Sequence, residues 1–140
     1  MREGWSSDDY LILFDKEEIA AATDRYQITQ FLPGFEVIGL RGWDDFLVRN
    51  SAGQVFCVPT VPLTPKYLER FTPPSRDEVL ETDVRFKGKI KWYIHPVVFG
   101  GSPQAHENMI WVDHVQHAEL VRQWNERYRD LTSAPTRNGE

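Results

Sequence analysis

The chain contains 140 residues, 41% of them hydrophobic, and carries a net charge of −5 at neutral pH. That length is typical of one ordinary domain and that apolar share allows a sizeable core, so we expect a single domain over residues 1–140. No apolar run approaches the roughly 20 residues of a membrane-spanning helix, and no basic-then-apolar leader opens the sequence, which predicts a cytoplasmic protein with no membrane partner. The single cysteine, Cys57, excludes a disulfide framework within one chain and is expected to be a small core residue.

The acidic residues are concentrated near the start of the sequence. Residues 1–50 hold ten acidic and five basic residues, whereas residues 51–100 hold five and seven. A surplus of carboxylates disfavours direct nucleic-acid binding, which depends on Lys and Arg meeting phosphates. It suits a protein partner with a basic surface, because opposite charges speed the encounter. The alternative is that the acidity only keeps the protein soluble.

The first elements are predicted from local signals. Residues 1–9 are polar and are expected to form a loose arm, and the apolar run Tyr10–Phe14 is typical of a buried strand. Asp15 stands three residues before Glu18, the spacing of a capping box, so a helix is expected from there to about Arg25.

A meander of three antiparallel strands is expected to form the core sheet. Its apolar runs are Phe35–Leu40, Phe46–Val48 and Val55–Val58, separated by the turn signals Arg41–Asp45 and Asn50–Gly53. After the meander, a short helix is predicted over residues 65–71, with Tyr67, Leu68 and Phe71 facing inward.

The second half of the domain, residues 76–131, follows a Pro-rich hinge at residues 72–75. A helical turn is expected at residues 76–81. Residues 84–96 alternate basic and apolar side chains, which predicts a strand with one cationic face; the basic positions are Arg85, Lys87, Lys89 and Lys91.

A long amphipathic helix is expected at the end of the chain, over about residues 116–131, after a last short apolar run at Met109–Val112. Asp113 is placed to cap its start, and residues 132–140 are predicted to form a frayed tail. The elements together predict an α+β fold: an antiparallel meander packed with a few helices, one of them long and C-terminal.

Motifs of common enzymes are missing. The sequence has no phosphate-binding glycine loop, no CxxC pair and no GxSxG elbow, so we expect no catalytic residues and no cofactor. The alternative is a small metal-dependent hydrolase that uses Asp113, His114 and His117, because two histidines three residues apart lie on one side of a helix. A fourth ligand at motif spacing is missing from this group.

The candidate partner-binding residues are an aromatic and two pairs of acids. Trp43 stands beside Asp44 and Asp45 at an expected hairpin tip, and an aromatic flanked by charges is typical of a binding hot spot. The alternative is that Trp43 folds over the sheet while the acids close the turn. Glu17 and Glu18 form the second candidate pair.

Residues 10–63 resemble the later half of the SUKH superfamily, the SMI/KNR-like proteins. The resemblance is carried by the segments LILFDKEEIAAATDRYQI, FLPGFEVIGLRGWDDFLVRN and GQVFCVPTVPL, although nothing before Tyr10 supplies the helices with which that family usually begins. The later pattern N-x8-H-x6-WN is similar to tails of bacterial immunity-type proteins; it comprises Asn108, His117, Trp124 and Asn125.

This resemblance implies a binding domain without enzymatic activity. Bacterial members of the family bind and block a toxin, often a nuclease, and have no fixed catalytic residues. It therefore implies an immunity protein whose partner is a cognate toxin with a basic surface. A structural subunit of a larger assembly and the metal-dependent hydrolase remain the alternatives, and the oligomeric state stays open.

Overall fold

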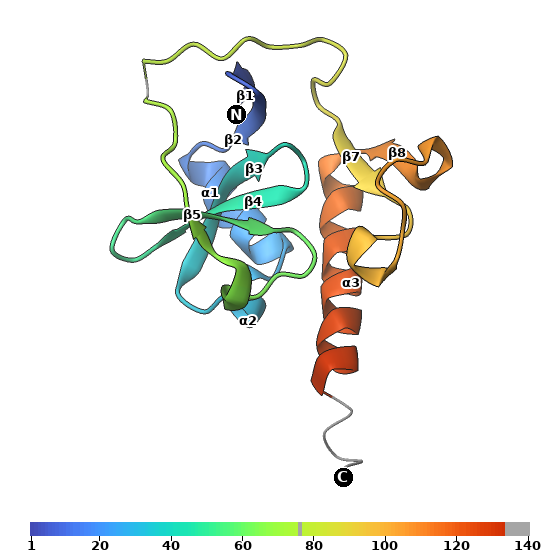
Figure 1. Ribbon diagram of the computed structural model, residues 1–140. Coiled ribbons are helices and arrows are strands. Elements are labelled where there is room, and N and C mark those ends of the chain that lie inside the picture. Colours follow the sequence, from blue (N-terminus) through green and yellow to red (C-terminus); the bar gives the residue numbers. More distant parts are fainter. Residues whose placement is uncertain (76, 134–140) are drawn as a thin grey trace.

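The computed structural model describes residues 1–75 and 77–133, which fold into two sheets and three α-helices (Figure 1). The larger sheet is antiparallel throughout and follows chain order; its strands are β1 (Arg2–Ser6), β2 (Asp9–Leu13), β3 (Phe35–Arg41), β4 (Asp45–Asn50), β5 (Val55–Pro59) and β6 (Glu69–Arg70). The smaller sheet pairs β7 (Ile90–Tyr93) with β8 (Met109–Val112). The helices are α1 (Lys16–Arg25), α2 (Ile28–Phe31) and α3 (His114–Ser133), with 3-10 turns η1 (Pro65–Tyr67), η2 (Val97–Phe99) and η3 (His106–Asn108). The α+β fold with a meander and a long C-terminal helix is confirmed.

Local capping signals were predicted correctly. The Asp15 side chain accepts from the backbone N–H of Glu18, and the Glu18 side chain accepts from that of Asp15, so the capping box starts α1. The same reciprocal contact occurs at α3, where Asp113 accepts from the Gln116 N–H at 2.8 Å. The helix begins two residues earlier than expected and continues to Ser133; residues 134–140 of the predicted tail lie outside the described residues.

The prediction of a loose N-terminal arm is wrong. Residues Arg2–Ser6 pair along their whole length with β2, and Trp5 packs edge-on against Tyr10 at 5.3 Å between ring centroids. The outer edge of β1 is covered by the segment after the hinge, since Trp5 and Glu81 exchange backbone hydrogen bonds of 2.9 and 3.2 Å. That pairing also replaces the helical turn expected at residues 76–81, of which residue 76 lies outside the described residues.

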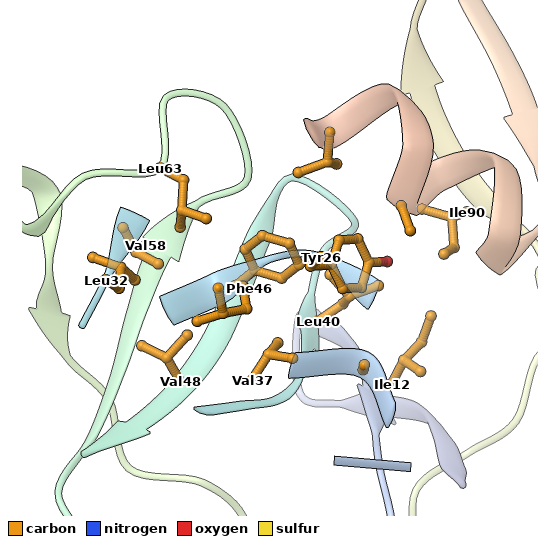
Figure 2. Packing of buried hydrophobic residues seen from close by; sticks show 14 of the residues in the cluster. Ile12, Tyr26, Leu32, Val37, Leu40, Phe46, Val48, Val58, Leu63 and Ile90 are labelled. Atoms are coloured by element: carbon orange, nitrogen blue, oxygen red, sulfur yellow. The ribbon is translucent and has the colours of Figure 1, made fainter. Parts of the chain in front are cut away.

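The sheet buries side chains on both faces because its strands alternate. One face carries the main core, which includes Tyr10, Phe46 and Val58, and the other carries a smaller cluster of Leu11, Ile38, Leu47 and Cys57. Figure 2 shows Tyr26, the residue that ends α1, beside Phe46 in the main core, with ring centroids 4.8 Å apart. Cys57 is 4% exposed, as expected for a core residue.

The small sheet and α3 close over the main core, and neither β7 nor β8 joins the larger sheet. Ile90 and Val112 from the small sheet, and Ala118 and Val121 from α3, are buried in that core. The buried Asn125 side chain in α3 accepts from the Leu63 N–H and donates to the Thr60 carbonyl, both at 2.7 Å. Figure 1 shows α3 and β7–β8 together beside the meander. The two halves therefore share one core.

Two predictions in the connecting segments are wrong. The basic strand is confined to β7, because residues 83–89 form hydrogen-bonded turns in which the Asp83 side chain accepts from the backbone and guanidinium of Arg85. The short helix after the meander is only the turn η1 followed by β6, and Tyr67 is 40% exposed instead of facing inward. Leu68 and Phe71 do pack against the core. No helix in the described residues is long and apolar enough to cross a membrane.

Candidate functional site

The β3–β4 turn is held in place from both sides. Its residues Gly42 and Trp43 have φ values of 59° and 66°, and such a left-handed backbone is uncommon for a tryptophan. The Gly42 N–H donates to the Tyr10 carbonyl of β2 at 2.8 Å, and the Asp44 carbonyl accepts from the Thr60 N–H after β5 at 2.9 Å. These contacts with the neighbouring strands fix where the turn presents its side chains.

Trp43 belongs to an aromatic cluster that joins the two halves, which we define as Trp5, Tyr10, Trp43, Phe86 and Trp111. The Trp43 ring is stacked on Tyr10, with centroids 5.2 Å apart, and meets Phe86 and Trp111 edge-on at 5.1 and 5.5 Å. Its side chain is half-buried as a result. This geometry favours the interpretation that Trp43 folds over the sheet; it positions the turn more than it offers a free contact surface.

Asp44 and Asp45 are adjacent carboxylates at the end of the turn, with Lys91 near the first and Arg41 near the second. Asp44 is exposed and Asp45 half-buried. Partial desolvation of the two carboxyl groups raises the pKa of both. The positive charge of Lys91 lowers the pKa of Asp44, and that of Arg41 lowers the pKa of Asp45, but neither effect is the larger one. For Asp45, the neighbouring carboxylates of Asp44, Glu69 and Asp9 raise the pKa further.

The guanidinium of Arg41 is shared among these acids. Its Nε lies 3.3 Å from Asp9, whereas its Nη1 is 4.0 Å from Asp45. Asp44 makes no ion pair within 4.0 Å among the described residues. One arginine therefore faces an acidic cluster, which we define as Asp9, Asp44, Asp45 and Glu69.

A pocket of about 290 Å³ lies beside the turn, lined by residues of both halves of the chain. Asp44 and Asp45 lie at its edge, and the remaining wall comes from the loop after β5, from β7 and from the segment around η2. The other lining residues are Pro59, Thr60, Val61, Trp92, Tyr93, Pro96, Val97 and Pro103. No sequence pattern indicates this pocket, because two segments line it, residues 44–61 and 92–103, and only folding brings them together.

Glu17 and Glu18 are not brought to the turn. Their helix follows the end of β2 that lies away from the turn, where the Phe14 N–H donates to the Ile38 carbonyl of β3. Asp9, at the other end of β2, contacts Arg41 beside the turn. A five-residue strand at about 3.3 Å per residue separates the two places. Glu18 is also engaged in the capping box and lies 2.9 Å from the Met1 amino group. Of this pair, Glu17 is the one that is exposed and has no such structural contact.

The metal site considered for Asp113, His114 and His117 is contradicted. His117 is fully buried, and its Nδ1 lies 2.6 Å from the Tyr26 hydroxyl; burial lowers the pKa of His117 to about 3. The Asp113 side chain is used to cap α3. No group of three or more His, Cys, Asp or Glu residues in the described part of the chain is arranged to hold a metal ion.

The residues of the pattern N-x8-H-x6-WN have structural contacts. Asn108 bonds both the N–H and the carbonyl of His95, at 2.8 and 3.0 Å, and thereby closes the loop between β7 and β8. His117 and Asn125 link α3 to the first half. The position of Asn125 beside the apolar stripe of the helix was the one sign that its side chain could be buried. Its hydrogen bonds to Leu63 and Thr60 were not predicted from the sequence.

No protein-family model matches this chain, and no curated protein or solved structure matches it at a significant level. The resemblance of residues 10–63 to the SUKH superfamily therefore rests on the residues quoted for it. The features that bear on function are therefore the β3–β4 turn, the acidic cluster and the pocket beside them.

Proposed function

We propose that this protein is a cytoplasmic immunity protein that binds a cognate bacterial toxin and blocks its action. The contact surface is the β3–β4 turn with the acidic cluster around it. The observation that carries the proposal is the pair Asp44 and Asp45, two carboxylates on a fixed turn: Asp44 makes no ion pair within 4.0 Å among the described residues, with Lys91 as its nearby cation, and Asp45 shares Arg41 with Asp9.

An acidic surface of this kind suits a toxin that acts on nucleic acid. A nuclease needs Lys and Arg residues around its active site to hold phosphates, so its substrate groove is basic. A protein that presents carboxylates to that groove is attracted at long range and excludes the substrate once bound.

The fixed backbone of the turn supports tight binding. Backbone hydrogen bonds to Tyr10 and Thr60 hold it on both sides, and the Trp43 ring packs against the rings of Tyr10, Phe86 and Trp111. A surface that is already ordered loses less conformational entropy on association than a flexible loop does.

The proposal is tested by co-purification with the protein encoded beside this gene. We expect a complex whose association rate falls as salt is raised and in which the partner loses its toxic activity. A partner that stays toxic in the presence of excess folded protein would refute the proposal.

A structural subunit remains a second candidate because the second half exposes apolar side chains. Ile110 and Trp111 on β8 are 40% and 44% exposed, and Val115 at the start of α3 is 64% exposed. A subunit of this kind would form a permanent assembly through β8. Sedimentation of the purified chain as a monomer, soluble at high concentration, would argue against it.

A further inference from the structure

The pocket between the β3–β4 turn and the second half has the chemistry of a site for a cationic side chain. We infer that it receives an arginine side chain of the toxin, which packs between the proline and aromatic wall and pairs with Asp44 and Asp45. This inference rests on the proposed function, and it adds the residue type that the partner must present.

Prolines and a paired backbone amide reduce the number of backbone donors in the wall of the pocket, although the buried indole N–H of Trp92 has no partner among the described residues. Pro59, Pro96 and Pro103 contribute no backbone N–H, and the Thr60 N–H is already donated to the Asp44 carbonyl. Carboxylates at one edge supply negative charge. An anion would be repelled by the carboxylates of Asp44 and Asp45, whereas a guanidinium supplies five N–H groups and can bind a carboxylate through two of them.

The aromatic residues of the wall suit a planar cation in particular. Trp92 and Tyr93 line the pocket, and a guanidinium stacks on such rings better than the compact ammonium of lysine. The Lys91 ammonium already lies 5.3 Å from the Tyr93 ring centroid and 5.8 Å from that of Trp43. A cation is therefore compatible with the rings on this side of the molecule.

Among the described residues, the cations nearest to Asp44 and Asp45 do not line the pocket. Arg41 contacts Asp9 at 3.3 Å and reaches Asp45 only at 4.0 Å, and neither Arg41 nor Lys91 lines the pocket. Desolvation raises the pKa of Asp44 and Asp45, which indicates carboxylates whose charge would gain from a further partner.

The size of the pocket favours one side chain over a larger ligand. Its volume of about 290 Å³ is at the lower limit of small-molecule sites, which span roughly 300–1,000 Å³. An extended arginine fits such a space, whereas a nucleotide or cofactor would remain mostly outside.

The test uses the isolated full chain and a peptide probe. Acetyl-Gly-Arg-Gly-amide is titrated into the 15N-labelled protein and followed by NMR, with the citrulline peptide as a neutral probe of the same shape. We expect saturable shifts of the Asp44, Asp45 and Thr60 amides and of the Trp92 indole N–H with arginine, and at least tenfold weaker binding with citrulline. Equal shifts with both peptides, or arginine shifts outside the pocket, would overturn the inference.

Variants separate the pocket from general charge. Asp44→Asn and Asp45→Asn keep the side-chain shape, and the hydrogen bond from Thr60 uses the Asp44 backbone, so the turn is expected to stay folded. The double variant should lose peptide binding at least tenfold, while Glu17→Gln, at an exposed position of α1, should leave it unchanged. Equal losses in both would show a nonspecific charge effect and overturn the inference.

The same double variant distinguishes the two proposals. If it still binds and neutralises the toxin as tightly as the parent chain, the arginine site is wrong and the immunity function stands. If the arginine peptide binds in the pocket but no toxin is neutralised, the pocket stands and the immunity function is wrong.

Discussion

The hydroxyl of Tyr26 lies 2.6 Å from Nδ1 of His117, although 91 residues separate the two in sequence. Tyr26 ends α1 and His117 lies in the first turns of α3, so this contact joins the two halves of the chain inside the main core. Trp92 of β7 meets the His117 ring edge-on at 5.5 Å. Both members of the pair are almost fully buried, and burial lowers the pKa of His117 while it raises that of Tyr26.

The buried His117 predicts loss of stability in acid. Its pKa is about 3 in the folded chain and about 6.5 when unfolded, so the unfolded state binds the proton first. The free energy of unfolding should be unaffected by this group above pH 6.5 and should fall by about 1.4 kcal/mol per pH unit as the pH drops from there towards 3. Urea unfolding at a series of pH values measures the slope.

Two variants show whether His117 causes this pH dependence of the free energy of unfolding. His117→Gln should lower stability at neutral pH and remove most of the dependence between pH 6.5 and 4. His106→Gln, at an exposed position, should keep the parent slope. A His117→Gln variant whose stability falls with pH as steeply as the parent's would show that other groups cause the acid sensitivity.

Asn125→Ala should destabilise the fold through two orphaned backbone groups. The change leaves the Leu63 N–H and the Thr60 carbonyl buried without their partner, and each such group costs about 1–3 kcal/mol. We expect a loss of about 2–4 kcal/mol in guanidinium unfolding. Gln123→Ala, at an exposed position two residues earlier in α3, should change the stability by less than about 0.5 kcal/mol. Similar values for both would mean that the contacts of Asn125 contribute little.

Gly39 in β3 lies against the backbone of β2, so a larger residue should not fit. A Cβ at this position would overlap the Ile12 carbonyl oxygen, which is backbone and cannot rotate away. Gly39→Ala is therefore expected to cost about 1–3 kcal/mol as an overpacking change, measured by thermal unfolding.

A turn glycine provides the comparison for Gly39. Gly53 has φ of +84° with nothing within 4 Å of an added Cβ, and asparagine tolerates this conformation, so Gly53→Asn should be close to neutral. An unchanged melting temperature for Gly39→Ala would contradict the close approach of β2 and β3.

Charge reversal at the turn should slow association with a basic toxin. In Asp44→Lys/Asp45→Lys the attraction becomes repulsion at the centre of the acidic cluster, so we expect the association rate at low salt to fall about tenfold or more and its salt dependence to flatten. Stopped-flow mixing with the toxin measures both quantities. Glu17→Lys should change them little, and identical kinetics for all three proteins would remove the turn from the interface.

The sequence by itself determined the elements whose causes are local. The Asp15–Glu18 box and the Asp113 cap act within one turn of their own helices, and the alternating apolar runs of the meander define strands that bury both faces. Such interactions join residues three or four apart, or repeat along one strand, so the pattern of side chains is sufficient to predict them.

Tertiary structure decided the elements whose causes are distant. Arg2–Ser6 forms a strand because β2 and Glu81 bond its two edges. Residues 84–89 leave the basic strand in turns that β1 holds, since the Trp5 indole N–H donates to Asp83 and the Gly88 N–H donates to Glu3. Whether the His117 side chain faces Tyr26 or solvent depends on how α3 packs against the meander. The pocket beside Asp44 depends in the same way on the packing of β7. A side chain's burial and charge environment are set by neighbours far along the chain, and these neighbours meet only in the folded protein.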